Sequence, residues 1–283
     1  MARLPQWSSW KLELHSGHYK ERLPPHSMKK ILKRAARKFG YEFRRRPDYD
    51  WLEPLDLLDH LRVKPGGELE TFLRYACANF PRSHAQLFQD LFVLAITNEK
   101  RGGYFVEFGA ADGKFLSNSF LLEKEFGWQG IVGEPSHNWH GELKKNRKCD
   151  IDIRCVWNAS GETVKFSESR DAEYSTISAF KAKDYHDRSH SKEYDVETVS
   201  LNDLLDQHKS PREMDYLSID TEGSESTILQ SLDFKERKFR IITVEHNYVR
   251  PERDDIFSLL SSHGYERVFG NITKWDDWYI NRR

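Results

Sequence analysis

Cysteine is scarce in this chain. Its 283 residues include only three cysteines, Cys77, Cys149 and Cys155, and no two of them have CxxC spacing. An odd number of isolated cysteines predicts neither a disulfide framework nor a thiolate zinc site. We therefore expect a reducing, cytoplasmic environment.

Long apolar runs are also absent. No stretch of about eighteen consecutive apolar residues occurs, and the N-terminal MARLPQWSSWKLELHSGHYK lacks the apolar segment of a signal peptide. The sequence predicts a protein that neither spans a membrane nor is exported by that route. A net charge of -1 argues against a surface built as a whole to coat nucleic acid, so any basic site must be local.

The length is enough for one large α/β domain and a smaller appendage. We predict that residues 1–82 form an N-terminal extension and residues 83–283 the main domain. Residues 28–39 combine apolar side chains at helical spacing with six Lys and Arg residues, which predicts a basic amphipathic helix. The segment 28–46 would then contact an anionic membrane surface or a polyanionic glycan, or it would simply be a solvated surface helix.

Short apolar runs alternate with helical or polar stretches from Ser83 onward. This alternation predicts a doubly wound, mostly parallel sheet with helices on both faces. Helices are expected over residues 68–80, 85–100 and 114–126. The strands are expected at Tyr104–Phe108, Gly130–Gly133, Ile151–Val156, Thr163–Ser167, Tyr216–Ile219, Ile241–Val244, Tyr265–Phe269 and Trp278–Ile280.

Ligands of such sheets bind beyond the carboxyl ends of the strands. The first strand runs into a loop of small residues that contains Gly109, Ala110, Asp112 and Gly113, with Glu107 just before it. Neither GxGxxG nor GxxxxGK[ST] occurs, which excludes the usual dinucleotide and phosphate loops. The two glycines allow a tight turn over a ligand, and the Glu107 carboxylate suits a cationic α-amino group.

The second strand ends at Glu134 and Pro135, about 20 residues beyond the loop. An acidic side chain in this position typically binds the hydroxyls of a nucleoside ribose. The loop and the second acid together predict a site for a positively charged nucleoside.

The ordered motifs YFVEFGAADG, GIVGEPS, VWNASGETVKF, VSLNDLL, DYLSIDTEGSESTIL and ITVEHN extend this interpretation. From Ser83 to Ile280 the chain resembles the FkbM family of methyltransferases. The resemblance implies a class I methyltransferase (Rossmann-like) fold, S-adenosylmethionine as cofactor, and O-methylation of hydroxyls, commonly on sugars. It also implies that Asn158 and Ala159 lie against the adenine, although they could equally be turn residues.

Acidic side chains follow two further strands. Asp220 and Glu222 come after the strand ending at Ile219, and Glu245 follows the strand ending at Val244. We expect Asp220 to face cofactor or acceptor and Glu222 to share a catalytic role, whereas Glu225 is explained by capping of the next helix. Asp220, Glu222 and Glu245 can together hold Mg²⁺, or each can bind cofactor or acceptor directly.

His246 is our predicted general base, because its ordinary pKa is near neutrality; the alternative is a histidine that only caps a strand end. Two other pairs, His137 with His140 and His186 with His190, have helical spacing but no cysteine or HExxH context, so we expect them to be solvated rather than zinc ligands. The polar segment 167–194 is either an acceptor lid or a surface loop.

These observations predict an S-adenosylmethionine-dependent O-methyltransferase acting on a hydroxyl, most simply of a sugar or polysaccharide. A non-sugar metabolite or lipid acceptor is one alternative, and a non-catalytic binding protein in a glycan-assembly complex is another. Nucleic acid is not expected as the acceptor, because the basic residues cluster in the extension.

Overall fold

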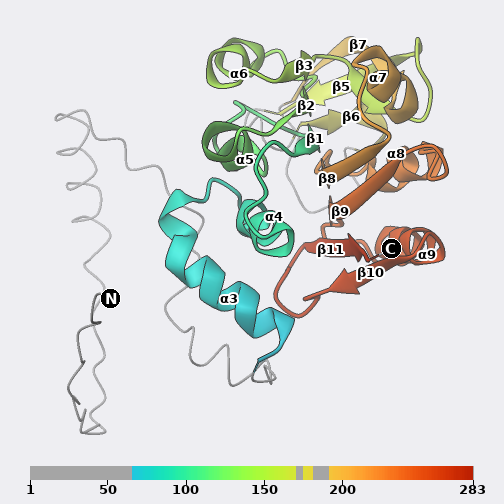
Figure 1. The fold of residues 1–283 in the computed structure, drawn as a ribbon. Helices are drawn as coiled ribbons and strands as arrows, with labels where there is room; N and C mark the ends of the chain where they lie inside the picture. The colour runs from blue at the N-terminus through green and yellow to red at the C-terminus, as the bar shows by residue number, and fades with distance from the viewer. Residues whose placement is uncertain (1–65, 170–174, 181–190, 283) are drawn as a thin grey trace, which may run out of the picture. The chain divides into compact units, whose positions relative to one another are not determined.

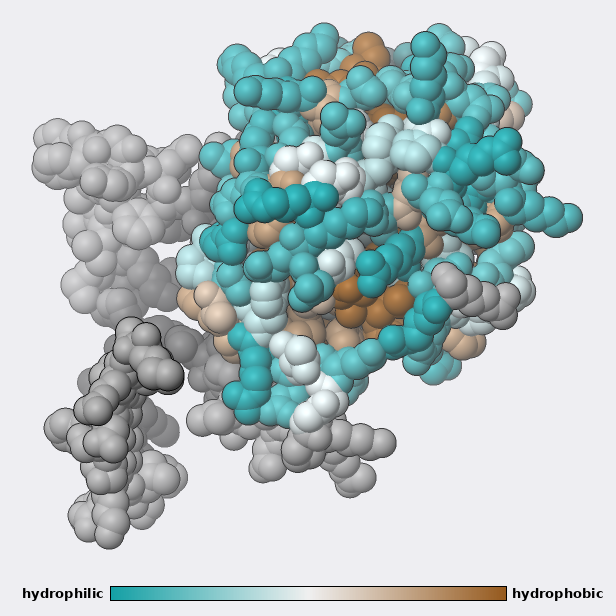
Figure 2. Space-filling view, in the orientation of Figure 1, coloured by the Kyte–Doolittle hydropathy of each residue, from teal (hydrophilic) through white to brown (hydrophobic). Residues whose placement is uncertain are grey.

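A computed structural model describes residues 66–169, 175–180 and 191–282. The predictions made for residues 28–46 and for the pair His186 and His190 lie outside the described residues. None of the described helices is long and apolar enough to cross a membrane. Figure 2 shows that the face in view carries mostly hydrophilic residues, with small apolar areas between them.

The central element is a seven-stranded sheet in the order β10-β11-β9-β8-β1-β2-β3 (Figure 1). Strand β11 runs antiparallel to both of its neighbours, and the other pairs are parallel. The predicted mostly parallel, doubly wound sheet is confirmed. Its strands are β1 (Tyr104–Phe108), β2 (Gln129–Gly133), β3 (Asp150–Asp152), β8 (Glu213–Ile219), β9 (Lys238–Glu245), β10 (Tyr265–Val268) and β11 (Asp276–Asn281).

The strand order reverses beside β1. The chain builds outward through β2 and β3 on one side of β1, and then through β8 and β9 on the other. A crevice forms at such a reversal because the connections on the two sides lead away from each other. The fold therefore places a ligand site at the carboxyl ends of β1 and β8.

Helices cover both faces of this sheet (Figure 1). Helices α4 and α5 lie on one side, and α8 and α9 lie on the other. The described helices are α3 (Glu68–Asn79), α4 (Gln89–Thr97), α5 (Phe120–Phe126), α6 (His140–Asn146), α7 (Leu201–Gln207), α8 (Glu225–Ser231) and α9 (Arg250–Ser262), with 3-10 turns η1 (Phe80–Arg82) and η3 (Ser178–Phe180).

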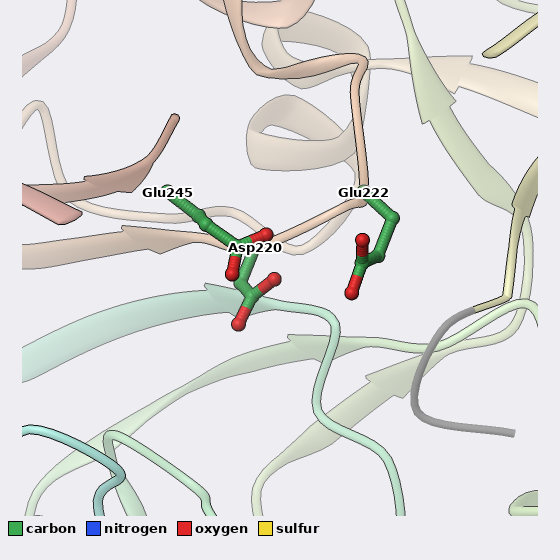
Figure 3. Close-up of side chains that lie close together, drawn as sticks. All are labelled: Asp220, Glu222 and Glu245. Carbon is green, nitrogen blue, oxygen red and sulfur yellow. The ribbon is translucent and has the colours of Figure 1, made fainter. Parts of the chain in front are cut away.

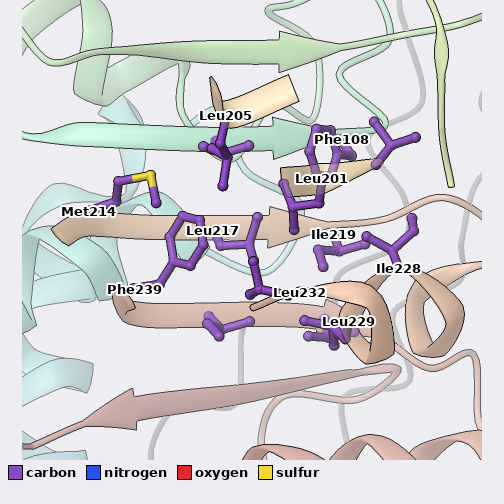
Figure 4. Close-up of a cluster of buried hydrophobic side chains, with 14 of the residues drawn as sticks. Phe108, Leu201, Leu205, Met214, Leu217, Ile219, Ile228, Leu229, Leu232 and Phe239 are labelled. Atoms are coloured by element: carbon purple, nitrogen blue, oxygen red, sulfur yellow. The ribbon is translucent and has the colours of Figure 1, made fainter. Parts of the chain in front are cut away.

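The face toward α7, α8 and α9 is the apolar core (Figure 4). Alternation along β8 explains why one face is apolar and the other is partly polar. Leu217 and Ile219 point into the core, whereas Tyr216 and Ser218 point to the opposite face, where the Tyr216 hydroxyl bonds with the Thr243 hydroxyl at 2.8 Å. Each fully buried Leu or Ile contributes about 1.5–3 kcal/mol, so this core supplies much of the folding free energy.

The opposite face is covered in part by α3. Phe72 of α3 packs edge-on against Phe92 and Trp278 and stacks on Phe269, with ring centroids 5.6–5.8 Å apart. The helix predicted over residues 68–80 is thus confirmed, and it packs against the sheet domain. The assignment of residues 1–82 as a separate extension stays a prediction.

A second sheet, in the order β4-β7-β5-β6, follows the first three strands. The predicted single strand 151–156 was wrong, because β3 ends at Asp152 and the chain turns before β4 begins. The Asp152 carboxylate accepts hydrogen bonds from the backbone and the guanidinium of Arg154, and Ile153 is 46% exposed in the corner. The strands of this second sheet are β4 (Cys155–Trp157), β5 (Thr163–Glu168), β6 (Thr176–Ile177) and β7 (Lys192–Ser200).

Replacement of Phe72 tests whether α3 belongs to the cooperative fold. Phe72 is 3% exposed, so Phe72→Ala leaves a cavity among aromatic rings and should lower the free energy of unfolding by about 3 kcal/mol. Phe80 is 49% exposed, and Phe80→Ala should change that free energy by less than about 0.5 kcal/mol. Urea denaturation measures both; equal values for the two variants would mean that α3 unfolds separately from the sheet.

Candidate functional site

The loop after β1 lies directly against the turn after β8. Gly109 has φ +79°, and a Cβ at this position would stand 1.8 Å from the carbonyl oxygen of Asp220. Gly113, with φ +77°, is also closely packed, since a Cβ there would be 2.6 Å from Leu143 Cδ1. Only glycine fits both positions. The two glycines therefore fix the path of the loop at the point where the strand order reverses.

The remaining loop residues hold this path by hydrogen bonds. Ala111 has φ +47°, unusual for a residue other than glycine, and its N–H donates to Glu134 Oε2 at 2.8 Å. The Ala110 carbonyl accepts from the Gly113 N–H at 2.8 Å. Asp112 Oδ1 accepts from the backbone N–H groups of Lys114 and Phe115, so its carboxylate is used by the chain around the loop itself.

Glu107 has partners other than the one predicted for it. Its buried carboxylate accepts hydrogen bonds from the Ser117 hydroxyl at 2.9 Å, the Asn118 N–H at 2.6 Å and the Ser119 hydroxyl, and it pairs with Arg147 at 3.3 Å. These four donors engage both oxygens. A direct contact with a cofactor amino group stays a prediction, and the geometry assigns Glu107 to holding the chain that follows the loop.

The same contacts explain why a predicted helix begins late. A helix over residues 114–126 was expected, but α5 begins only at Phe120. The N–H of Asn118 bonds to the Glu107 carboxylate, and Leu116 has φ +58° and pairs with Ala85. The prediction for residues 114–119 was wrong because this segment wraps around a buried side chain instead of forming helical hydrogen bonds.

Glu134 lies at the end of β2 and faces the loop 109–113, which is called the cofactor loop below after the role predicted for it. One carboxylate oxygen accepts from the Ala111 N–H and the other from the Ser136 N–H, both at 2.8 Å. Burial, together with the nearby carboxylates Asp220 and Glu168, raises the pKa of Glu134 to about 7 against the lowering effect of these two hydrogen bonds. Each oxygen keeps a lone pair for a ribose hydroxyl. Pro135, which follows directly, is partly exposed at the same edge.

Asn158 and Ala159 follow β4, in the second sheet. Asn158 is exposed, and the Ala159 carbonyl accepts a hydrogen bond from the Thr198 hydroxyl at 2.8 Å. This bond ties the turn to β7. Their contact with an adenine stays a prediction.

Asp220, Glu222 and Glu245 converge at the carboxyl edge (Figure 3). One carboxylate oxygen from each lies within 4.8 Å of the others. The register of the sheet explains the convergence, because the last paired residues of β8 and β9 are Ile219 and Val244, so that Asp220 and Glu245 emerge side by side. Glu222 reaches the same place from a left-handed backbone position, φ +59°.

These carboxylates perturb one another. Burial raises the pKa of Asp220, and burial together with the neighbouring charges of Asp220 and Glu222 raises the pKa of Glu245 well above its ordinary value. The Asp220 and Glu245 carboxyl groups interact directly, so a negative charge on Asp220 makes ionisation of Glu245 less favourable. The Asn247 amide donates to Glu245 at 2.7 Å and to Glu222 at 3.3 Å, so that one side chain stabilises two of the three carboxylates.

Glu225 behaves as a capping residue. Its carboxylate accepts hydrogen bonds from the N–H groups of Thr221 and Gly223 at the start of α8. The Glu225 carboxylate thus lies at the N-terminus of α8, where the helix dipole favours a negative charge.

His246 points away from the carboxylate cluster. Its Nδ1 accepts a hydrogen bond from the Tyr248 N–H at 3.0 Å, and its Nε2 lies 3.8 Å from an oxygen of Asp277. The ring is on the same side of β9 as Val244, because side chains alternate along a strand, and it is 1% exposed. Burial lowers the pKa of His246. The ring is not placed to reach an acceptor, so its role as the base stays a prediction that this geometry does not favour.

His137 and His140 are engaged in other contacts. His137 stacks on Tyr194 with ring centroids 4.2 Å apart, and His140 Nε2 bonds to the Glu134 carbonyl at 3.0 Å. Among the described residues, the one cluster of His, Cys, Asp and Glu side chains close enough to hold a metal ion is the three-carboxylate cluster. The two histidines instead brace the turn after β2.

Hydrogen bonds connect the second sheet to this site at two places. The Ser136 hydroxyl donates to Glu168 of β5 at 2.6 Å, beside the Glu134 turn. The Thr176 hydroxyl of β6 donates to the Glu222 carbonyl at 2.7 Å. The second sheet therefore contacts both the expected ribose side and the carboxylate cluster.

Several residues of the site were missed from the sequence. The Ser-Asn-Ser run at 117–119, Arg147 and Asn247 make the contacts described above. The first has a recognisable signal, because small polar residues before FLLEKEF are typical of a helix start near residue 120. Arg147 has no such signal, since its acceptors lie 24–40 positions away in the chain.

A large groove lies at the other edge of the sheet. It encloses about 1070 Å³ at the amino ends of β8 and β9, where Met214 and Phe239 form part of its wall. This position is opposite the carboxyl edge, so the groove is separate from the candidate site.

Comparison with known families identifies the family of this chain. The model of the methyltransferase FkbM domain matches residues 107–267, more than half of the chain. The chain belongs to the FkbM methyltransferase family. It is an S-adenosylmethionine-dependent methyltransferase of that type, and the matched span begins at Glu107 and includes the cofactor loop, Glu134 and the carboxylate cluster.

Solved structures show weak similarity to this FkbM methyltransferase. They include the methyltransferase FkbM from Methylobacillus flagellatus KT (10% identity, 89% of this chain and 70% of that chain, TM-score 0.41). An O-methyltransferase from Bacillus cereus in complex with SAH matches at 11% identity over 80% of this chain and 96% of that one, with TM-score 0.40. No curated protein matches the chain. The family assignment rests on the family model.

Gly109→Ala tests the loop as the cofactor site. The added Cβ would collide with the Asp220 carbonyl and displace the loop, so the affinity for S-adenosylhomocysteine should fall by more than about tenfold. Gly127→Ala is the matched control, since Gly127 also has a positive φ, +69°, but open space around it. That control should lose about 1 kcal/mol of stability and keep its affinity. Titration calorimetry of both variants decides; equal affinities would contradict the assignment.

Cofactor binding should depend on pH through Glu134. Ribose hydroxyls donate to the ionised carboxylate, and with a pKa of about 7 the group is mostly protonated at pH 6. Binding at pH 6 must first release that proton, so the affinity for S-adenosylhomocysteine should be about tenfold weaker than at pH 8.

The control for this titration is Glu134→Gln, which should bind more weakly and lose most of the pH dependence. A wild-type affinity that stays constant from pH 6 to pH 8 would argue against Glu134 as the ribose ligand.

Proposed function

We propose that this methyltransferase transfers the methyl group of S-adenosylmethionine to a hydroxyl, and that the acceptor is a saccharide. The observation that carries the proposal is the convergence of Asp220, Glu222 and Glu245 beside the cofactor loop. A hydroxyl is a poor nucleophile until it loses its proton, so an acceptor site for O-methylation requires a proton acceptor at the reacting oxygen. Buried carboxylates of raised pKa meet that requirement.

The reaction is an in-line displacement. The acceptor oxygen forms a bond to the methyl carbon as the carbon–sulfur bond breaks, and the electron pair of that bond stays on sulfur in S-adenosylhomocysteine. The hydroxyl proton passes to a carboxylate. The positive charge of the sulfonium is lost as the ether forms, so the chief contributions of the protein are alignment and proton removal.

The Asp220–Glu245 pair is the proposed proton acceptor. The two carboxylates lie at the reversal of the strand order, and Asp220 touches the cofactor loop at Gly109. Their raised pKa values make them stronger bases than ordinary carboxylates. His246 is less suited, because its ring is buried toward Asp277.

The same oxygens also suit a hard divalent ion. Asp220, Glu222 and Glu245 would hold Mg²⁺, which would lower the pKa of a bound acceptor hydroxyl. The protein side chains alone supply a complete route for the proton, so we propose catalysis without a required metal.

A saccharide acceptor is supported by the polar and aromatic groups of this edge. Carboxylates and the Asn247 amide can bind vicinal hydroxyls, and the Tyr248 ring, 57% exposed, follows directly. Asn247 and Tyr248 have φ of +43° and +60°. Such strained positions persist where the surrounding structure enforces them, frequently at ligand sites. A non-sugar hydroxyl remains the alternative acceptor, and a non-catalytic binding protein the alternative function.

Product analysis tests the proposal. The purified chain is incubated with methyl-labelled S-adenosylmethionine and a set of neutral and acidic oligosaccharides, polyols and hydroxylated lipids, and mass spectrometry locates the label. We expect a labelled methyl ether on a saccharide. Label confined to a lipid or polyol would overturn the saccharide acceptor, and bound cofactor with no transfer to any member of the set would favour the non-catalytic alternative.

Glu245→Gln should separate the two candidate bases. Loss of this proposed proton acceptor should lower turnover by about 10²-fold or more while changing the affinity for S-adenosylhomocysteine little. His246→Gln should keep turnover within a few-fold of wild type, because its ring nitrogens face Tyr248 and Asp277. Steady-state kinetics at saturating cofactor measure both, and the reverse order of effects would restore His246 as the base.

A chelator serves as the control for the metal alternative. Activity should survive EDTA unchanged. Loss of activity in EDTA that added Mg²⁺ restores would instead assign the cluster to the metal.

A further inference from the structure

We propose that Arg147 is a positioning residue that holds the cofactor loop in its binding shape before the cofactor arrives. The inference rests on S-adenosylmethionine as the cofactor and is independent of the acceptor. Arg147 lies at the end of α6, outside the motifs by which the sequence was interpreted, and its side chain is 0% exposed. A fully buried guanidinium is costly unless its donors are used, so its partners indicate what it does.

Every branch of this guanidinium has an acceptor. Nε donates to Glu123 at 2.5 Å, and Nη2 donates to the Ser119 hydroxyl at 2.7 Å. Nη1 is shared among Glu107 at 3.3 Å, the Ser117 hydroxyl at 3.1 Å and the Gly113 carbonyl at 3.3 Å. The planar fork of arginine can make these contacts together, whereas a lysine ammonium cannot span them.

The contacts reach both ends of the cofactor loop. Glu107 stands just before the loop, and Gly113 closes it. The aliphatic part of Arg147 also forms the surface on which Gly113 rests, since a Cβ on Gly113 would be 2.7 Å from Arg147 Cγ. The neighbouring Asn146 amide donates to the Asp112 carbonyl at 2.8 Å. The end of α6 therefore fixes the loop from beneath.

The positive charge of Arg147 has a second consequence. Glu107 raises the pKa of Asp220, so its negative charge is felt at the carboxylate cluster. The Arg147 guanidinium lies 3.3 Å from the Glu107 carboxylate and occupies it within the protein. Without Arg147, the buried Glu107 carboxylate would lose its cationic partner and would be drawn toward the cationic cofactor. That movement would displace Ser117 and Ser119, which are bound to the same carboxylate.

The test uses the full chain and measures S-adenosylhomocysteine binding by calorimetry and thermal unfolding side by side. Arg147→Met removes both the positive charge and the planar guanidinium, whereas Arg147→Lys keeps the charge only. The double variant Glu107→Gln with Arg147→Met removes the charges of both residues. Arg253→Met is the matched control, because Arg253 makes a two-point ion pair of 2.7 and 2.8 Å with the buried Asp277, on the other face of the sheet.

We expect Arg147→Met and Arg147→Lys to weaken S-adenosylhomocysteine binding by about tenfold or more at a temperature where both are folded. The double variant should recover thermal stability relative to Arg147→Met, because the buried charge of Glu107 is removed together with its partner, but it should not recover the affinity. Arg253→Met should lose thermal stability and keep its affinity.

Wild-type affinity in a folded Arg147→Lys would overturn the proposal, as would an equal loss of affinity in Arg253→Met. If Arg147→Met does not fold, the lysine variant and the double variant decide by the same criterion. Failure of the wild-type chain itself to bind S-adenosylhomocysteine would overturn the cofactor assignment, a result distinct from either outcome for Arg147.

Discussion

The close approach of the turn after β1 to the turn after β8 sets the dimensions of the site. With Gly109 against the Asp220 carbonyl, there is no room for a side chain between the cofactor loop and the first carboxylate of the cluster. The register of β8 with β9 then places Glu245 beside Asp220. The cofactor loop and the carboxylate pair proposed as the proton acceptor are thus neighbours because of backbone packing, before any side chain adjusts.

The carboxyl edge concentrates negative charge that the fold must stabilise. Glu107 is paired with Arg147, Glu134 accepts two backbone N–H groups, and burial together with the charge of Asp220 raises the pKa of Glu245. These arrangements differ in what they leave available for a ligand. All contacts of Glu107 are inside the protein, Glu134 keeps lone pairs for a ligand, and the Asp220–Glu245 pair is the proposed proton acceptor. A cationic sulfonium nucleoside is the ligand that this arrangement favours electrostatically.

The sequence predicted the sheet and the convergence of the carboxylates because both follow from strand ends meeting at one edge. It did not predict the break between β3 and β4, since one Asp-x-Arg contact produces it. The late start of α5 and the role of Arg147 depend on contacts between distant positions, which local patterns do not contain. The orientation of His246 was predictable, because adjacent strand residues face opposite sides and Glu245 faces the cluster.

The second sheet has one further consequence. It leaves the seven-stranded layer at the corner of Asp152 and Arg154, and it meets the site through the Glu168 and Thr176 hydrogen bonds. Its own small core, Cys155, Phe166, Ile177 and Val196, is distinct from the main one. One side of this sheet can therefore be repacked through these four residues alone, whereas Val156 of β4 and Val199 of β7 belong to the main core and tie the two sheets together.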